Sequence, residues 1–311
     1  MLTALYFILG LGLLYYGADY LVKGGASIAL KLKVSPLVIG LTLVAYGTSA
    51  PELVVSVDAA LKGLGDVSIG NVVGSNICNI ALILGLCAAI TPLRVNPELL
   101  KKDFWIMLGA AVLLLGFYAL NGGVNRWEAA LLLTGSITYT LWSFHSSRKA
   151  EKTTPVEEMP ESRYNIWLSV LMVMGGLAAL VGGAKLFVNA AIVIAHSCGV
   201  SEAVIGLTVV AVGTSLPELA TSVVAAVKKE QDIAIGNVVG SNIFNILAIL
   251  GVAPLISPIQ TQGISYVDMF LMTGVTVLLY PFMKSGMKIS RKEGIVFLSI
   301  YILYTVYLIF K

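Results

Sequence analysis

The sequence predicts an all-α polytopic membrane protein in which ten transmembrane helices form two inverted five-helix repeats. The first observation is composition: 58% of the 311 residues are hydrophobic and 12% are charged, whereas soluble domains carry roughly 25% charged residues. The second is that apolar runs of about 20 residues, the length that spans a bilayer, recur along the sequence. The third is that the sequence matches itself after a shift of 166 residues. No nucleic-acid-binding or nucleotide-binding motif is present.

Hydropathy, with Gly, Pro and charge as punctuation, places the ten spans. They lie near residues 3–30, 37–61, 69–91, 104–120, 127–146, 165–195, 203–227, 234–256, 265–283 and 293–310. The first run has no basic flank and no small-residue cleavage site, so we expect a span rather than a removable signal peptide. The polar stretch 147–163 predicts a linker between a first repeat, 1–146, and a second, 164–311.

Lys and Arg are distributed unevenly between the two sets of loops. Fifteen of the twenty fall in loops on one face, and only Lys62, Arg126 and Lys311 fall on the other. Cytoplasmic loops of membrane proteins carry the excess of Lys and Arg. We therefore expect a plasma (inner) membrane protein with both termini outside, extracellular or periplasmic, and the 147–163 linker in the cytoplasm.

The internal repeat is strongest in two polar, glycine-containing segments. Residues 39–57 match 205–223 at 14 of 19 positions, and residues 70–85 match 236–251 at 13 of 16. Lipid-facing helices need only general apolarity, so identity at polar and Gly positions indicates a shared function. Because each repeat has five spans, the second copy enters the membrane from the opposite side. Inverted repeats with interrupted helices typically place a transport site near the midplane.

The second and seventh spans are interrupted by GTSAPE, residues 47–52, and GTSLPE, residues 213–218. Pro51 cannot donate a backbone hydrogen bond, and it disfavours the helical conformation at Ala50. The preceding carbonyls must then face protein or a hydrated cavity. Glu52 falls in the first turn of the next half-helix, where the helix dipole favours an anion. Such carbonyl, hydroxyl and carboxylate oxygens suit a hard cation such as Ca²⁺. Neither motif contains the Cys or His that thiophilic metals prefer.

The spans that follow carry a second motif, GNVVGSN-I-x-N-I, in both repeats. Ser75 and Asn79 are four residues apart and share a helix face, as do Ser241 and Asn245. Their side-chain oxygens can complete a central oxygen cage. The alternative is that these side chains have a purely structural role. The glutamates would then be protonated or hydrogen-bonded packing residues, and the Ser and Asn side chains would serve as polar contacts between helices.

At these residues the chain resembles the sodium/calcium exchangers of the cation:calcium antiporter superfamily. Two copies of GTSxPEL and two of GNVVGSNIxNI stand where that family has its two α-repeats. The resemblance implies exchange of Na⁺ for Ca²⁺ by alternating access, without a cofactor or an obligatory protein partner. The first and sixth spans would slide across the other eight. The neutral Asn245 is similar to the potassium-independent type, because potassium-dependent relatives have Asp there. The implied ion ligands are Ala45, Thr48, Ser49, Glu52, Ser75, Asn79, Ala211, Thr214, Ser215, Glu218, Ser241 and Asn245.

Three other functions are alternatives to exchange. A Ca²⁺/H⁺ antiporter would use the same two carboxylates, so the sequence does not exclude this function. A cation channel would not need an interrupted, inverted site. An enzyme is not expected, because Ser49 and Glu52 have no His nearby in the sequence. Asp19 and Lys23 lie in the first span, and Lys185 occupies the register position of Asp19. This broken symmetry favours a gating or snorkelling role there over ion ligation.

Overall fold

The computed structural model describes residues 2–153, 164–197, 211–261 and 263–310. Within these residues the chain is almost entirely helical, with four two-residue strands. Seven helical segments in the described residues are long and apolar enough to cross a membrane, and one bent pair makes an eighth. The seven are Thr3–Leu32, Gly65–Ile90, Asp103–Asn121, Ile166–Ser197, Gln231–Ile256, Tyr266–Met287 and Arg291–Phe310.

The first half of the chain contains one long helix, a broken span and four further helical segments. Its elements are α1 (Leu2–Leu32), α2 (Pro36–Ile39), η1 (Gly40–Val44), α3 (Ala45–Thr48), α4 (Ala50–Leu61), α5 (Gly65–Ile77), η2 (Cys78–Leu84), α6 (Gly85–Ile90), β1 (Leu93–Arg94), α7 (Pro97–Lys101), α8 (Asp103–Asn121), β2 (Gly123–Val124) and α9 (Arg126–Thr153).

The second half repeats this order. Its described elements are α10 (Ile166–Ser197), α12 (Ala211–Gly213), α13 (Leu216–Val227), α14 (Gln231–Phe244), η4 (Asn245–Ile249), α15 (Leu250–Ile256), β3 (Ile259–Gln260), α16 (Tyr266–Lys284), η5 (Ser285–Met287), β4 (Lys288–Ile289) and α17 (Arg291–Phe310). The segments η1, η2 and η4 are π-helical, and η5 is a 3₁₀ turn.

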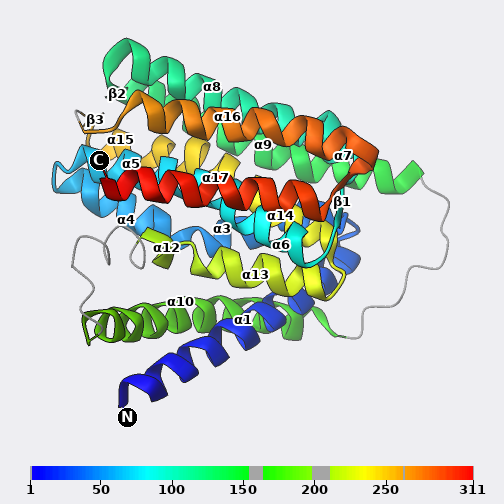
Figure 1. Ribbon diagram of the computed structural model, residues 1–311. Coiled ribbons are helices and arrows are strands. Elements are labelled where there is room, and N and C mark those ends of the chain that lie inside the picture. The colour runs from blue at the N-terminus through cyan, green and yellow to red at the C-terminus, as the bar shows by residue number, and fades with distance from the viewer. Residues whose placement is uncertain (1, 154–163, 198–210, 262, 311) are drawn as a thin grey trace.

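The helices form layers around a central group (Figure 1). The long helices α1 and α10 pack against each other on one side, and α8, α9 and α16 lie on the opposite side. Between them lie α5 to α6 and α14 to α15, the most deeply buried spans. The broken span of the first half and the described part of its counterpart, α12 and α13, lie between this central group and the α1–α10 pair.

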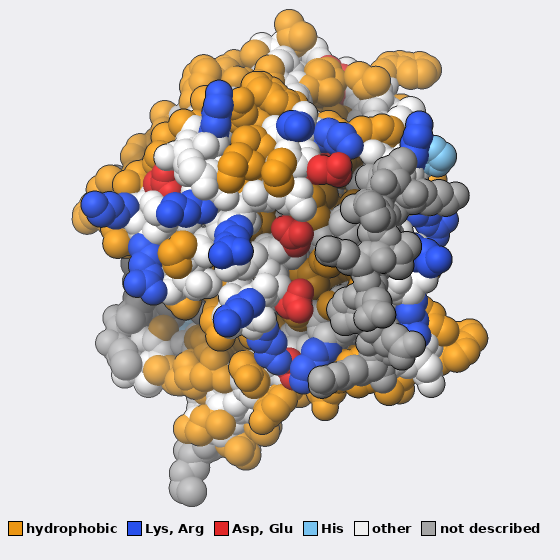
Figure 2. Space-filling model, turned by 90° about the vertical axis from the view of Figure 1, so that its right-hand side faces the viewer, with side chains coloured by type: hydrophobic (Ala, Val, Ile, Leu, Met, Phe, Trp, Pro, Cys, Tyr) orange, Lys and Arg blue, Asp and Glu red, His pale blue; other side chains and the backbone are white. Residues whose placement is uncertain are grey.

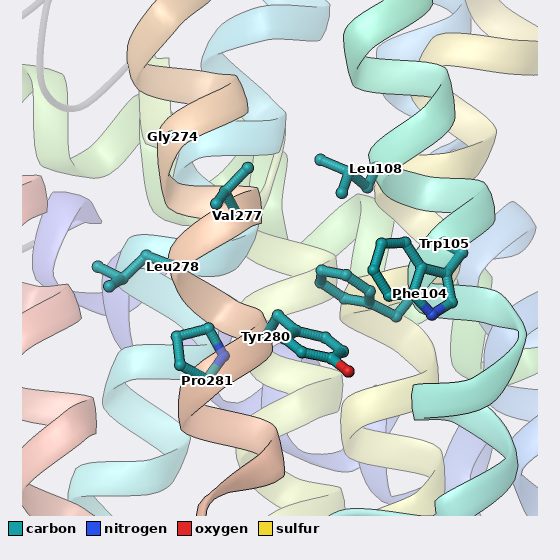
Figure 3. A pocket seen from close by; sticks show the side chains of 8 residues that line it. All are labelled: Phe104, Trp105, Leu108, Gly274, Val277, Leu278, Tyr280 and Pro281. Atoms are coloured by element: carbon teal, nitrogen blue, oxygen red, sulfur yellow. The ribbon is translucent and has the colours of Figure 1, made fainter.

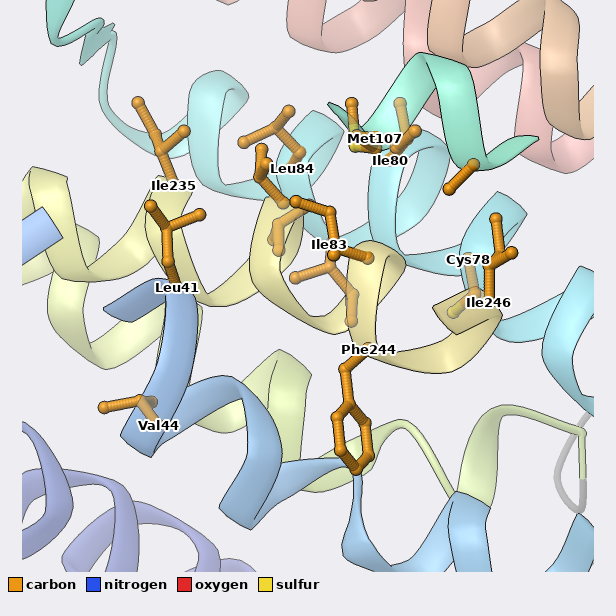
Figure 4. Close-up of a cluster of buried hydrophobic side chains, with 14 of the residues drawn as sticks. Leu41, Val44, Cys78, Ile80, Ile83, Leu84, Met107, Ile235, Phe244 and Ile246 are labelled. Carbon is orange, nitrogen blue, oxygen red and sulfur yellow. The ribbon is translucent and has the colours of Figure 1, made fainter. Parts of the chain in front are cut away.

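Close backbone contact sets the position of η1 against α14. A Cβ added at Gly240 would lie 2.3 Å from the carbonyl oxygen of Leu41, so only Gly fits there. Apolar side chains fill the space around this contact, including Leu41 from η1, Ile83 from η2 and Phe244 from α14 (Figure 4). The polar groups described below therefore lie beside a close-packed apolar core.

The two halves contain the same local structures near positions related by the 166-residue shift. β1 pairs with β4 and β2 pairs with β3, each time joining the two halves. These two pairings lie at opposite ends of the molecule (Figure 1). Tyr139 donates a hydrogen bond to Asp103 at 2.9 Å, and Tyr304 donates one to Asp268 at 3.0 Å. The internal repeat in the sequence thus has a counterpart in structure.

Eight of the ten expected spans coincide with segments long and apolar enough to cross a membrane, one of them as the bent pair. The helix α9 covers the expected span 127–146 but is not among these segments, and the expected span 203–227 is described only in part. Two details of the helices also differ from expectation. The helix α9 continues through 147–153, so the start of the expected linker is helical. The break in the second span falls one residue earlier than expected: Ala50 is helical, and Ser49 holds the bend. Residues 198–210, which include the start of the expected seventh span, lie outside the described residues.

Candidate functional site

Both broken spans bend at the serine of the GTS motif. Ser49 has φ −85° and ψ 7°, and Ser215 has φ −86° and ψ 7°. In the first repeat the two half-helices meet at 47°. Pro51 lies in the first turn of α4, where its missing N–H costs no helical bond. This position explains why Ala50 can remain helical and the bend moves to Ser49.

The two bends face each other, and each serine is hydrogen-bonded to the glutamate of the other repeat. The Ser49 hydroxyl donates to Glu218 Oε1 at 2.6 Å, and the Ser215 hydroxyl donates to Glu52 Oε1 at 3.2 Å. Each glutamate is only 1% exposed. The reciprocal bonds bring both buried carboxylates into one site that neither repeat could form alone.

The threonines and Ser75 complete this polar group. Thr48 Oγ1 lies 3.1 Å from Asn237 Oδ1, and the Thr48 side chain also lies beside Glu218. Thr214, which is half-buried, lies beside Glu52 in the same way. The Ser75 hydroxyl is 3.4 Å from that of Ser215. The motif side chains of both repeats therefore converge on the two carboxylates.

The two alanines were expected to offer carbonyl oxygens. The Ala45 carbonyl already accepts hydrogen bonds from the Ser49 N–H at 3.0 Å and from Thr48 Oγ1 at 3.3 Å. An ion at this oxygen would have to share it with those donors. Ala211 lies at the start of α12, and only its backbone is described.

Asn79 and Asn245 lie in the π-helical segments η2 and η4. Single π-turns inside helices are often found at functional sites. The Asn79 amide donates to Asn242 Oδ1 at 3.2 Å, and the Asn245 amide donates to Asn76 Oδ1 at 3.0 Å. These bonds hold each amide by its nitrogen and leave its oxygen available.

Several buried oxygens have no hydrogen-bond partner within the described residues. They are Glu52 Oε2, Glu218 Oε2, Asn79 Oδ1, Asn245 Oδ1, Ser241 Oγ and Thr221 Oγ1. Leaving a buried polar group unsatisfied costs about 1–3 kcal/mol, and more for a charged one. A cation bound between Glu52 and Glu218 would satisfy their free Oε2 atoms, and an all-oxygen set matches the ligands of Ca²⁺ and not those of soft metals. The described residues contain no cluster of three or more His, Cys, Asp or Glu.

Two asparagines of the second motif, which we did not expect to contribute, hold the backbone of the site glutamates in place. Asn71 Nδ2 donates to the Glu52 carbonyl at 3.1 Å and to Ser56 Oγ at 2.9 Å. Asn237 Nδ2 makes the corresponding bonds in the second repeat, to the Glu218 carbonyl at 3.4 Å and to a serine hydroxyl. Asn71 and Asn237 are identical in the repeat alignment, and this identity could have predicted their contribution.

A groove of about 510 Å³ lies elsewhere, between α8 and α16 (Figure 3). Its lining consists of Phe104, Trp105, Leu108, Gly274, Val277, Leu278, Tyr280 and Pro281. No carboxylate or amide lines it, so it lacks the oxygen ligands that a hard cation such as Ca²⁺ prefers. The cage around Glu52 and Glu218 is therefore the candidate site.

Comparison with known proteins gives full-length matches. A family model described as sodium/calcium exchanger protein matches residues 2–145 and 168–310. The chain is 40% identical to the putative antiporter CaxA of Alkalimonas amylolytica over 100% of both chains. It is 37% identical to the sodium/calcium exchanger MaX1 of Methanosarcina acetivorans, again over 100% of both.

A solved structure of the sodium-calcium exchanger NCX_Mj is 37% identical, with a TM-score of 0.85 and 99% of each chain covered. The same two stretches of sequence that the family model matches contain both copies of each motif and thus both halves of the oxygen cage. The chain belongs to the sodium/calcium exchanger protein family and is a multi-pass membrane transporter, not an enzyme.

Proposed function

We propose that the protein is a secondary antiporter that exchanges Na⁺ for Ca²⁺, with both ions using the oxygen cage around Glu52 and Glu218. The observation that carries this proposal is the reciprocal pair of hydrogen bonds between Ser49 and Glu218 and between Ser215 and Glu52. It joins two buried carboxylates at the repeat interface, and the second oxygen of each lacks a hydrogen-bond partner among the described residues.

The charge of the cage explains why transport would be exchange. Two carboxylates give a charge of about −2, which one Ca²⁺ neutralises but which requires more than one Na⁺. An empty cage keeps its negative charge, and an uncompensated charge at the bilayer centre costs several kcal/mol. The empty protein would therefore change its orientation slowly. Na⁺ and Ca²⁺ would compete for the same carboxylates, hydroxyls and amide oxygens.

Alternating access would follow from the inverted arrangement of the two repeats. We assign five spans to each repeat, with the broken span 37–61 and its counterpart 203–227 antiparallel. The strand pairs β1–β4 and β2–β3 at opposite ends of the molecule support this arrangement. During alternating access α1 and α10 would move together across the remaining spans.

The uneven distribution of Lys and Arg supports an orientation in the plasma (inner) membrane. Figure 2 shows Lys and Arg gathered on the end of the molecule that holds α7, β1 and β4, which we call the basic face. We assign the basic face and the 147–163 linker to the cytoplasm, and both termini to the outside. The first repeat then covers 1–146 and the second covers 164–311.

The test is ⁴⁵Ca²⁺ uptake into proteoliposomes loaded with Na⁺, compared with choline-loaded vesicles at clamped pH. We expect uptake that depends on the outward Na⁺ gradient and that falls at least a hundredfold in Glu52→Gln and in Glu218→Gln. The control is Glu98→Gln, which removes an exposed carboxylate and should leave uptake unchanged.

Two results would change the assignment. Full uptake in either site variant would remove the carboxylates from the mechanism. Uptake that ignores Na⁺ but follows an imposed pH gradient would retain the cage and identify a Ca²⁺/H⁺ antiporter.

A further inference from the structure

One buried carboxylate outside the cage connects the α1–α10 pair to a broken span. Asp19, in the middle of α1, is 8% exposed. It accepts a hydrogen bond from Lys23 at 2.9 Å and forms an ion pair with Lys228, the residue that follows α13. The helices α1 and α13 also pack directly on each other. Because α13 begins two residues before Glu218, this pair ties α1 to the helix that carries a site carboxylate.

The other repeat cannot form the same contact. In the 166-residue register Lys185 takes the place of Asp19, and Lys62 takes the place of Lys228. Lys62 instead bonds to Asp58 within its own helix, where both side chains are more than half exposed. The packing of α10 on α4 is also much sparser than that of α1 on α13. Bringing α10 onto α4 in the mirrored arrangement would place two lysines together.

We propose that Asp19 and Lys228 are positioning residues that hold the basic face closed and so set the ratio of the two access states. The proposal rests on the alternating access proposed above. In the described structure α1 and α13 are joined at the basic face, and in the opposite form that contact must open. The pair therefore stabilises one form, and like-charged Lys185 and Lys62 give the other form no matching contact. The two access states therefore differ in free energy.

The expected effect follows from the burial of the pair. The side chains of Asp19 and Lys228 are 11% and 30% exposed. Exposed pairs contribute up to about 1 kcal/mol, or about fivefold in an equilibrium, and breaking buried pairs costs more. Apparent affinity at one face scales with the fraction of protein open to that face. Breaking the pair should therefore lower half-saturating Ca²⁺ at the basic face about fivefold or more.

The experiment measures half-saturating Ca²⁺ separately at each face, in oriented vesicles of the full-length protein. Asp19→Asn and Lys228→Gln should each give the fivefold decrease at the basic face. At the opposite face the change should be under twofold, because that form already predominates. A variant that only damages folding would lower maximal uptake and leave half-saturating Ca²⁺ unchanged at both faces, and such a result would overturn the proposal.

Three further variants distinguish the contact between Asp19 and Lys228 from local effects of charge. Lys23→Gln and Asp58→Asn each break only a pair within one helix and should change neither face by more than twofold. Lys185→Asp supplies the missing partner for Lys62 and should also lower half-saturating Ca²⁺ at the basic face, because it stabilises closure of the other face. If Lys23→Gln matches Lys228→Gln, or if Lys185→Asp has no effect, the contact between α1 and α13 does not set the ratio.

A readout independent of transport tests the contact between Asp19 and Lys228 separately from the proposed exchange. Asp19→Cys with Lys228→Cys, in a background with the three native cysteines replaced, should be cross-linked by a short bifunctional thiol reagent. Moving the second cysteine from position 228 to position 62 should abolish the cross-link. A cross-link in the first pair with no Na⁺-dependent uptake in the unmodified protein would reject the exchange and keep the contact. No cross-link in either pair would reject the contact.

Discussion

The contact between α1 and α10 gives the sharpest test of the fold, because two adjacent glycines should respond in opposite ways. A Cβ added at Gly176 would lie 2.7 Å from the carbonyl oxygen of Gly17 and 2.8 Å from the amide nitrogen of Leu21. Both are backbone atoms, so no side-chain rotation relieves the overlap. Ordinary contacts begin near 3.5 Å, so the two helices would have to separate by about 0.8 Å. At Gly175, which is exposed, an added Cβ meets none of the described residues within 4 Å.

The magnitude follows from the difference between the two variants. Gly→Ala within a helix gains up to about 1 kcal/mol from helix propensity, and this gain is common to Gly175→Ala and Gly176→Ala. Only Gly176→Ala also carries the cost of overpacking, about 1–3 kcal/mol. The free energy of unfolding of the two variants should therefore differ by about 1–3 kcal/mol, with Gly176→Ala the less stable.

The assay is denaturant unfolding in detergent micelles, followed by tryptophan fluorescence, with both variants and the unmodified protein measured in parallel. Gly175→Ala should be as stable as the unmodified protein or slightly more stable. Equal stability of the two variants would refute the close approach of α1 and α10 at this point. It would also remove the physical basis for treating these helices as one moving unit.

Two further predictions concern the site and the core. Ser49→Ala removes a hydroxyl oxygen that we propose as an ion ligand, together with its 2.6 Å hydrogen bond to Glu218. Loss of one ligand should raise half-saturating Ca²⁺ in the uptake assay about tenfold, which corresponds to about 1.4 kcal/mol; an unchanged value would contradict a role for this hydroxyl. Tyr139→Phe leaves the buried Asp103 carboxylate without its 2.9 Å donor, so the free energy of unfolding should fall by about 1–3 kcal/mol. Half-saturating Ca²⁺ should not change, and stability equal to that of the unmodified protein would show that the bond contributes nothing.

Most of the helices were predictable because hydropathy and breakers act locally. The expected span 104–120 is α8, Asp103–Asn121, and the expected span 293–310 is α17, Arg291–Phe310. The position of the bend was less predictable. Proline disfavours a helical residue before it, which pointed to Ala50, but a proline in the first helical turn tolerates one helical residue ahead of it. The bend at Ser49 follows from that small difference.

The sequence predicted which motif residues would meet, but not how they would pair. Ser49 could bond to Glu52, three residues away, or to a group from the other repeat; the structure pairs it with Glu218. Packing of α3 against α13 and α14 decides this, and no local pattern contains that information. The ion pair between Asp19 and Lys228 is a contact of the same kind, between residues 209 positions apart.

The internal repeat also separates two kinds of functional position. Ser49 and Ser215 are identical between the copies and form the same bond from opposite directions, as the proposed exchange would require of a site reached from both faces of the membrane. Asp19 and Lys185 differ between the copies, and a symmetric site gains nothing from such a difference. The two directions of transport can be made unequal only where the copies differ. Asymmetry in this protein is therefore to be sought where the copies differ, as at Asp19 and Lys185, and not among the identical residues of the cage.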